Sequence, residues 1–301
     1  MKTSTLTSDA LLLLTAAIWG FAFVAQRVGM DYVGPFTYNG VRFALGCLSL
    51  APLLPGSRHA AVGALPVAER RLFLVGGGAL GIVLFIAASL QQVALLYTTA
   101  GKAGFITGLY VVIVPLCGLF WGRRPGGGTV IGALLAAVGL YFLSVTESVE
   151  MEFGDGLVLV SAFFFATQVL LVAWLSPRVN PVRLAFYQFA VCSLLSLVAA
   201  FCFEAVSWNG IRAAALPILY GGILSVGVAY TLQVVAQRDA HPAHASILMS
   251  LEAVFAAIGG WLLLDESMNL RGGLGCGLML TGMVVSQVWA LKLRRSECGG
   301  L

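Results

Sequence analysis

The chain is a succession of long apolar runs, and the order of these runs repeats about halfway along the sequence. Roughly 20 mainly apolar residues cross a bilayer as a helix. Ten runs meet this requirement: 9–29, 35–54, 72–96, 99–121, 127–146, 154–175, 181–203, 213–236, 242–264 and 272–291. The pattern predicts an all-α integral membrane protein with ten transmembrane helices.

The repetition extends to individual residues. Leu90-Gln91-Gln92-Val93-Ala94 recurs as Leu232-Gln233-Val234-Val235-Ala236, 142 residues later. Other residues recur at nearly the same offset: Gly132 as Gly275, Gly139 as Gly282, and Asp9 as Asp155. Each half holds five runs, an odd number, so the second half enters the membrane from the opposite side. Two inverted halves around a midplane site are typical of secondary transporters. We therefore predict two inverted five-helix repeats, at 9–146 and 154–291.

Composition excludes several other classes of protein. Of the 301 residues, 59% are hydrophobic and only 10% are charged, whereas a soluble domain carries about 25% charged residues. The net charge of +4 does not indicate nucleic acid, because the basic residues are scattered between apolar runs. The six cysteines form no C-x-x-C motif, and the chain has no phosphate-binding G-x-x-x-x-G-K-[ST] loop. We expect no metal, no cofactor, no nucleic-acid partner and no enzymatic activity.

The distribution of lysine and arginine predicts the orientation. Loops on the side of the chain termini hold 12 basic residues: Lys2, Arg58, Arg70, Arg71, Arg123, Arg124, Arg178, Arg183, Arg238, Lys292, Arg294 and Arg295. The other side holds 4: Arg27, Lys102, Arg212 and Arg271. Because basic residues concentrate in cytoplasmic loops, we expect both termini in the cytoplasm and a multi-pass protein of the inner or plasma membrane.

Three stretches resemble a known family. The first runs from Thr99 to Pro115 (TAGKAGFITGLYVVIVP) and is followed by GRRP at 122–125. The second is LEAVFAA at 251–257, followed by Asp265-Glu266, and the third is Ile18-Trp19-Gly20. Together they resemble the EamA-type transporters of the drug/metabolite transporter superfamily, over about residues 9–290. Ala253 stands where the family usually has proline, and Arg124 where its first repeat often has glutamate.

The resemblance implies ten helices in two inverted repeats around a central cavity. It also implies transport of small metabolites, often amino acids or related compounds and often outward.

Two charged residues fall well inside predicted spans, away from the span ends, where an ionisable side chain is costly and usually faces a cavity or a partner. Glu252 lies near the middle of the ninth span. It could bind a substrate amine or carry a proton, or it could belong to a structural pair. Arg42 lies about seven residues into the second span. It could bind a substrate carboxylate, or its long side chain could reach the outer interface.

Further candidates are polar or aromatic. Gln91, Gln92 and Gln233 occupy a recurring position, and amides both donate and accept hydrogen bonds, which suits a polar substrate as well as helix–helix contacts. Trp19, Tyr38, Asn39, Tyr110, Tyr187 and Gln188 lie in the inner parts of spans. Lys102 and His244 correspond at an offset of 142, each near a predicted helix start. They are candidate substrate or coupling residues, with an interfacial role as the alternative.

These observations predict a secondary transporter that moves a small polar metabolite by alternating access at a central cavity, with export favoured over import. The alternatives are an intramembrane enzyme that uses Glu252 or His244, and a passive channel. The expected partners are a small-molecule substrate and the lipid bilayer, with the protein as a monomer or homodimer.

Overall fold

A computed structural model of the chain describes residues 5–54, 67–120, 126–144, 153–238, 240–265 and 270–298. Every secondary-structure element within these ranges is helical. The basic pair Arg123-Arg124, which enters the predicted orientation, lies outside the described residues.

Helices occupy all ten predicted apolar runs. Those of the first half are α1 (Thr5–Gly29), α2 (Pro35–Leu50) with the short η1 (Ala51–Leu53), α3 (Val67–Ala94), α4 (Ala100–Gly108), α5 (Tyr110–Phe120) and α6 (Gly127–Ser144). Those of the second half are α7 (Phe153–Leu175), α8 (Pro181–Phe203), α9 (Trp208–Ala213), α10 (Ala215–Leu219), the π-helical η3 (Tyr220–Tyr230), α11 (Thr231–Ala236), α12 (Pro242–Met249), α13 (Glu252–Leu263) and α14 (Leu270–Cys298).

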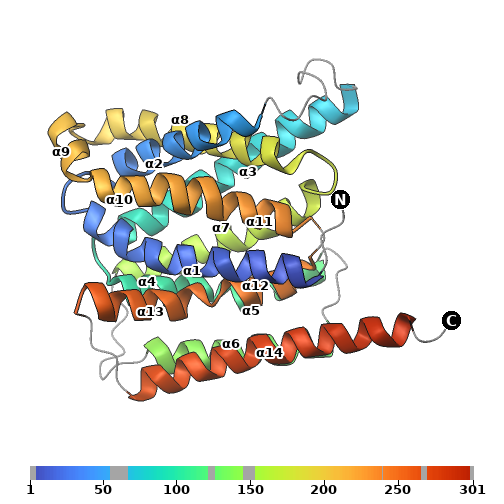
Figure 1. Ribbon diagram of the computed structural model, residues 1–301. Helices are drawn as coiled ribbons and strands as arrows, with labels where there is room; N and C mark the ends of the chain where they lie inside the picture. The colour runs from blue at the N-terminus through green and yellow to red at the C-terminus, as the bar shows by residue number, and fades with distance from the viewer. Residues whose placement is uncertain are drawn as a thin grey trace.

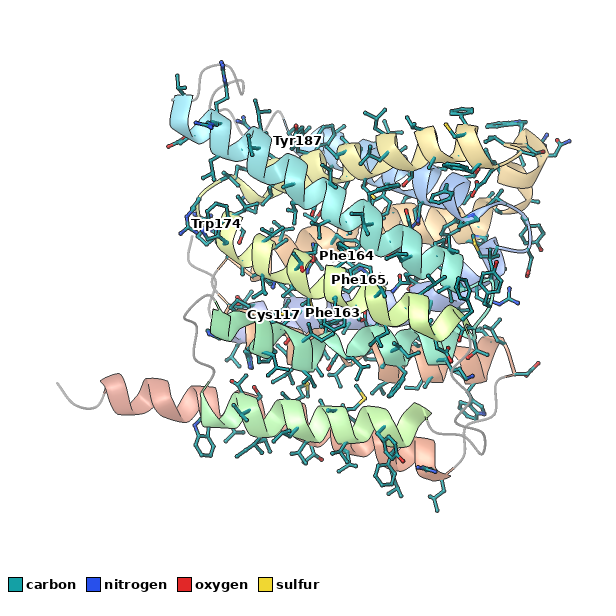
Figure 2. The ribbon with its side chains drawn as sticks, turned by 180° about the vertical axis from the view of Figure 1, so that it is seen from behind. Cys117, Phe163, Phe164, Phe165, Trp174 and Tyr187 are labelled. Atoms are coloured by element: carbon teal, nitrogen blue, oxygen red, sulfur yellow. The ribbon has the colours of Figure 1, made fainter. Side chains whose placement is uncertain are left out.

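The described helices include seven spans that are long and apolar enough to cross a membrane, judged by length and composition. The shorter apolar segments Gly127–Gly139 and Gly273–Ser286, and the 16-residue α2, fall outside that count. Large apolar side chains project outward from the bundle. Phe163 and Trp174 on α7, for example, are 52% and 41% exposed (Figure 2). Seven apolar spans together with an apolar outer surface indicate a multi-pass membrane protein.

The helices lie roughly parallel in layers (Figure 1). α2, α3 and α8 form one side, α6 and α14 form a separate pair on the other side, and α1, α7 and the interrupted helices lie between them. Closely packed pairs such as α6–α14, α2–α8, α3–α7 and α1–α13 join segments far apart in sequence. α1 begins and α14 ends at the same end of the bundle (Figure 1).

Two of the predicted spans are interrupted at corresponding places. α4 ends at Gly108 and α5 begins at Tyr110, whereas α12 ends at Met249 and α13 begins at Glu252. At both breaks the chain tightens: Leu109 N–H donates to Ile106 and Leu251 N–H donates to Leu248, three residues back instead of four. The second break forms although Ala253 replaces the usual proline, so a proline ring is not required for it.

Paired glycines allow α6 and α14 to cross closely. A Cβ atom added at Gly132 would lie 2.7 Å from the carbonyl oxygen of Gly282, and one added at Gly139 would lie 2.6 Å from that of Gly275. Without a strong hydrophobic force between helices in lipid, close backbone approach supplies much of the packing energy. Gly132 recurs as Gly275 and Gly139 recurs as Gly282. Exchanging the two halves therefore converts the Gly132–Gly282 contact into the Gly139–Gly275 contact.

Candidate functional site

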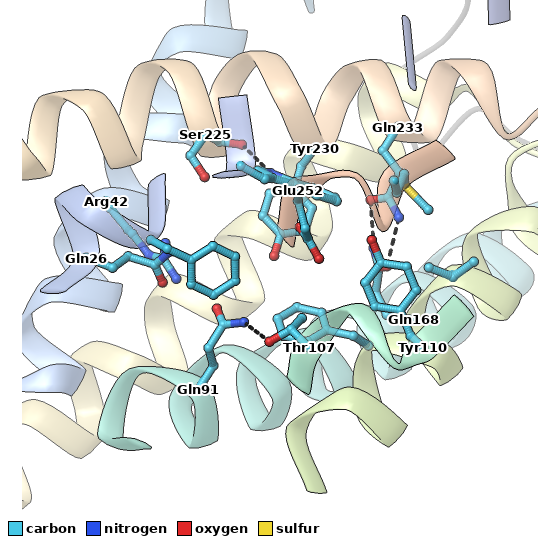
Figure 3. A pocket seen from close by; sticks show the side chains of 15 residues that line it. Gln26, Arg42, Gln91, Thr107, Tyr110, Gln168, Ser225, Tyr230, Gln233 and Glu252 are labelled. Atoms are coloured by element: carbon cyan, nitrogen blue, oxygen red, sulfur yellow. Dashed lines mark hydrogen bonds between the residues drawn. The ribbon is translucent and has the colours of Figure 1, made fainter. Parts of the chain in front are cut away.

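A buried pocket lies at the centre of the bundle, beside both helix interruptions (Figure 3). Both halves of the chain contribute to it. Its lining residues are Trp19, Phe23, Gln26, Arg42, Gln91, Thr107, Tyr110, Phe165, Gln168, Val169, Ser225, Tyr230, Gln233, Met249 and Glu252. This mixture of aromatic walls and a few polar groups is typical of sites for small molecules.

α1 contributes one face of the pocket. Trp19, Phe23 and Gln26 follow the spacing that places residues on the same side of a helix. The indole Nε1 of Trp19 donates a hydrogen bond to the carbonyl oxygen of Ser225 at 3.2 Å. Its ring also packs against that of Tyr230, with centroids 4.6 Å apart. α1 is thereby fixed to η3, a π-helical segment of a kind that often occurs at functional sites.

Arg42 of α2 brings a positive charge into the pocket. Its side chain is only 2% exposed, so it does not reach an interface as one interpretation of the sequence allowed. Nε donates to Oδ1 of Asn39 at 2.9 Å, and Asn39 in turn donates through Nδ2 to the carbonyl of Ala88 at 3.0 Å. The guanidinium lies 5.4 Å from the ring centroid of Tyr38 and 5.1 Å from that of Phe43. Asn39 and Tyr38 therefore position Arg42 without lining the pocket themselves.

Glu252 brings a carboxyl group to the same pocket and is 3% exposed. It is the first residue of α13, and Tyr110, its counterpart at an offset of 142, is the first residue of α5. The positive end of a helix dipole favours an anion at such a position. The hydroxyl of Tyr110 has no hydrogen-bond partner, and neither has Oε1 of Glu252. This oxygen is free to accept a hydrogen bond from a substrate.

Amide side chains supply further polar groups. Gln91 donates through Nε2 to the hydroxyl of Thr107 at 3.0 Å. Gln168 and Gln233 exchange two hydrogen bonds, Nε2 of each donating to Oε1 of the other at 3.2 and 3.0 Å. Gln92 points elsewhere and donates to the carbonyl of Gln26 at 3.2 Å. Gln91 and Gln233 thus line the pocket, whereas Gln92 joins α3 to α1.

Three other residues predicted from the sequence lie outside the pocket. Tyr38 is fully buried and its hydroxyl donates to the carbonyl of Pro217 at 3.0 Å. Tyr187 packs against Phe73, with ring centroids 5.3 Å apart. Gln188 is fully buried, and neither amide atom has a hydrogen-bond partner. Pro181 precedes Gln188 by seven residues, as Pro35 precedes Arg42, so the two residues lie at similar depths, but Gln188 does not line the pocket.

Lys102 and His244 also lie away from the pocket, each paired with an aspartate from the opposite half of the chain. Nε2 of His244 is 3.0 Å from Oδ1 of Asp9, and Nδ1 is 3.1 Å from the hydroxyl of Ser286. Nζ of Lys102 is 3.9 Å from Oδ2 of Asp155. His244 is 7% exposed and therefore buried within the protein.

Comparison with known proteins identifies the family. The EamA-like transporter family matches the chain twice, at residues 6–145 and at residues 152–287. This chain belongs to the EamA-like transporter family. Membership confirms the resemblance drawn from the three sequence stretches, and two copies of the family unit account for the recurrence of residues along the chain.

Relatives of this EamA-like protein are also transporters by name. An uncharacterized transporter of Archaeoglobus fulgidus is 33% identical over 280 residues, which is 92% of this chain and 85% of the relative. The uncharacterized transporter YoaV of Bacillus subtilis is 22% identical and covers 89% of this chain and 92% of its own length. A solved crystal structure superposes with a TM-score of 0.76 at 19% identity, over 95% of this chain and 98% of that one, which shows a shared fold.

Several pocket residues of the EamA-like protein were not among the sequence candidates. Gln26, Thr107, Gln168, Ser225 and Tyr230 are the polar ones. Gln168 carried a usable signal, since a glutamine in the apolar run 154–175 needs a hydrogen-bond partner. Ser225 contributes through its main-chain carbonyl, which composition cannot reveal. Among the described residues, no group of three or more His, Cys, Asp or Glu side chains is arranged to hold a metal ion.

Proposed function

We propose that this EamA-like protein is a secondary transporter of a small polar metabolite that carries both a positive and a negative group, an amino acid or a related compound. One observation carries the proposal: Arg42 and Glu252 line the same buried pocket, and within the described part of the chain neither has an ion-pair partner. A buried charge without a partner is costly. A zwitterionic substrate would supply a carboxylate to Arg42 and an ammonium group to Glu252.

The rest of the pocket supports a small substrate. Gln91 and Thr107 supply donors and acceptors, and the rings of Trp19, Tyr230 and Phe165 supply apolar walls. The chain contains no phosphate-binding loop for ATP, so the energy would come from a substrate or ion gradient. We propose export as the direction, because the transporters that the sequence resembles often move metabolites outward.

Alternating access is the mechanism that fits this architecture. We propose ten spans in two inverted repeats, 9–146 and 154–291, with both termini in the cytoplasm. The protein would lie in the inner or plasma membrane as a monomer or homodimer. The reciprocal contacts Gly132–Gly282 and Gly139–Gly275 support a two-fold relation between the halves. Helices interrupted beside a central pocket are typical of carriers in which one repeat rocks against the other.

A binding screen followed by counterflow tests the function. The melting temperature of the purified protein is measured in the presence of single amino acids, nucleosides, sugars or amphiphilic cations. A ligand present at 100 times its Kd stabilises the fold by about 2.7 kcal/mol. The ligand that raises the melting temperature is then loaded into proteoliposomes. Saturable counterflow of labelled ligand supports a carrier. Non-saturable flux would indicate a channel, and chemical conversion of the ligand would indicate an enzyme.

A pair of variants keeps the test specific. Glu252→Gln removes a charge from the pocket, whereas Tyr187→Phe removes a hydroxyl from a residue outside it. We expect the first variant to lose the ligand-induced stabilisation and the second to keep it. Stabilisation by zwitterions that is equal in both variants would contradict the assignment of the pocket.

A further inference from the structure

Two contacts between an acidic and a basic side chain join the halves of the chain, and each is the counterpart of the other. Asp9 pairs with His244 at 3.0 Å, and Asp155 pairs with Lys102 at 3.9 Å. Asp9 corresponds to Asp155, and Lys102 corresponds to His244. Exchanging the two halves therefore converts the first pair into the second. Each pair takes its acid from one repeat and its base from the other, so each is a contact between repeats.

The pairs lie at opposite ends of the bundle. Asp9 and His244 lie near the beginnings of α1 and α12, at the end of the bundle where α14 finishes (Figure 1). Lys102 and Asp155 lie in the first turns of α4 and α7. A surface cavity lined by Arg27, Thr98 and Thr99 places this second pair beside the carboxyl end of α1.

The central pocket lies between the two pairs. His244 precedes Glu252 by eight residues, and Lys102 precedes Tyr110 by eight residues. At 1.5 Å per residue, each basic residue is about 12 Å along its span from the pocket residue that follows it. The two pairs thus flank the pocket at equal separations.

Burial and supporting hydrogen bonds show that the pairs are built into the fold. Asp9, Asp155 and His244 are 8%, 6% and 7% exposed, whereas the side chain of Lys102 is 29% exposed. The Thr98 hydroxyl donates to Oδ1 of Asp155 at 2.8 Å, and Ser286 contacts the second ring nitrogen of His244 at 3.1 Å. Desolvation offsets most of the attraction within a buried ion pair, so such a pair adds little net stability. A contact that is worth little overall can be made and broken in every transport cycle.

We propose that Asp9–His244 and Lys102–Asp155 are paired latches, one at each end of the pocket, and that opening one favours closure of the other. The proposal rests on the proposed function, in which the repeats rock around the pocket. Rocking of two inverted repeats separates them at one end while pressing them together at the other. In this structure both pairs are formed.

Hydrogen–deuterium exchange followed by mass spectrometry tests this on the purified full-length protein. Asp155→Asn removes the charge but keeps an oxygen for the Thr98 hydroxyl, and Asp9→Asn is the matched variant at the other end. We expect Asp155→Asn to speed exchange in the segments containing Thr98 and Asp155 and to slow it near His244. Asp9→Asn should give the reverse pattern. The expected change is about fivefold or more, the lower end of measured coupling between sites.

The opposite response at the distant end separates a latch from a local structural contact. A structural contact would speed exchange only at its own end, and that result would overturn the proposal. The doubly exchanged variant Lys102→Asp/Asp155→Lys restores an ion pair and should return the wild-type pattern. This double variant also carries the test if an asparagine variant fails to purify. Faster exchange than in the wild-type protein in the segments containing positions 98 and 155 would then overturn the latch. Because no substrate is needed, this result is independent of whether the transport proposal holds.

Discussion

Gln168 and Gln233 lie side by side in the wall of the pocket and exchange two amide hydrogen bonds, at 3.2 and 3.0 Å. Both side chains are buried, at 1% and 0% exposure. The pair joins α7 to α11, so two segments of the second repeat are held together at the pocket wall. Since each amide satisfies the other, neither is obliged to contact a substrate. We expect the pair to be structural even though it lines the pocket.

A double-mutant cycle tests that expectation. Gln233→Leu leaves Gln168 buried without its partner, and an unpaired buried amide costs about 1–3 kcal/mol. Gln168→Leu should cost a similar amount. The double leucine variant leaves no unpaired amide and should lose less stability than the sum of the single variants. Melting temperatures of the four proteins measure the coupling. Strictly additive losses would show that the two amides do not act as a pair.

A second prediction concerns the charge and shape of Arg42. Arg42→Lys keeps the charge but loses the Nε donor to Asn39 and the planar contact with Tyr38. We expect the affinity for a carboxylate-bearing substrate to fall about 10- to 100-fold, since a hydrogen bond to a charged group is worth about 1.5–3 kcal/mol. The ligand-induced shift in melting temperature measures the loss. The same replacement at a position outside the central pocket, Arg183→Lys, is the matched control and should leave the shift unchanged.

A third prediction concerns Glu252. Glu252→Gln keeps the size and hydrogen-bonding capacity of the side chain but removes its charge. If Glu252 binds an ammonium group or carries a proton, the variant should express and melt normally yet lose saturable transport. In the opposite case, a structural ion pair, removing one partner would cost several kcal/mol and expression would fall. Wild-type transport by the glutamine variant across the pH range would remove Glu252 from the mechanism.

The fold was largely predictable because the membrane restricts the choices. A backbone in lipid must satisfy its own hydrogen bonds, so apolar runs of this length become helices. All ten predicted runs are helical, and the number of membrane crossings stays a prediction beyond the seven spans that length and composition support. The breaks at Leu109 and Leu251 were not predictable from a proline rule, since Ala253 carries no ring constraint. Residues next to both breaks line the central pocket.

The sequence predicted which types of residue form the site, but not the direction in which each side chain points. A charged or amide side chain in an apolar run is costly unless it faces a cavity or another polar group, and Arg42, Gln91, Gln233 and Glu252 do meet at one pocket. Gln188 has the same depth as Arg42, but depth along a helix does not fix the direction in which a side chain points. The partners of Lys102 and His244 could not be derived either, because each aspartate comes from the other repeat.

A fourth prediction tests the topology. Reporter fusions after Glu150 and after Ser296 should report opposite sides of the membrane, with the second in the cytoplasm. The physical reason is the excess of lysine and arginine in loops on the side of the termini. Alkaline phosphatase and a fluorescent protein, each active on one side only, provide complementary readouts. The same side for both positions would contradict five spans in each half.

The last prediction concerns the crossing of α6 and α14, where two glycines allow close approach. A Cβ atom at position 132 would lie 2.7 Å from the Gly282 carbonyl oxygen, closer than real Cβ contacts come. Backbone cannot move aside as a flexible side chain can, so Gly132→Ala must push the two helices apart, and overpacking of this kind costs about 1–3 kcal/mol.

Gly273→Ala on α14 is the matched control, because a Cβ atom there meets nothing within 4 Å. Alanine favours a helix over glycine by up to about 1 kcal/mol, so this control should melt at the same temperature or higher. Thermal unfolding of both variants is measured in the same detergent. Equal melting temperatures would show that the crossing tolerates separation and that the glycines are not what holds α6 against α14.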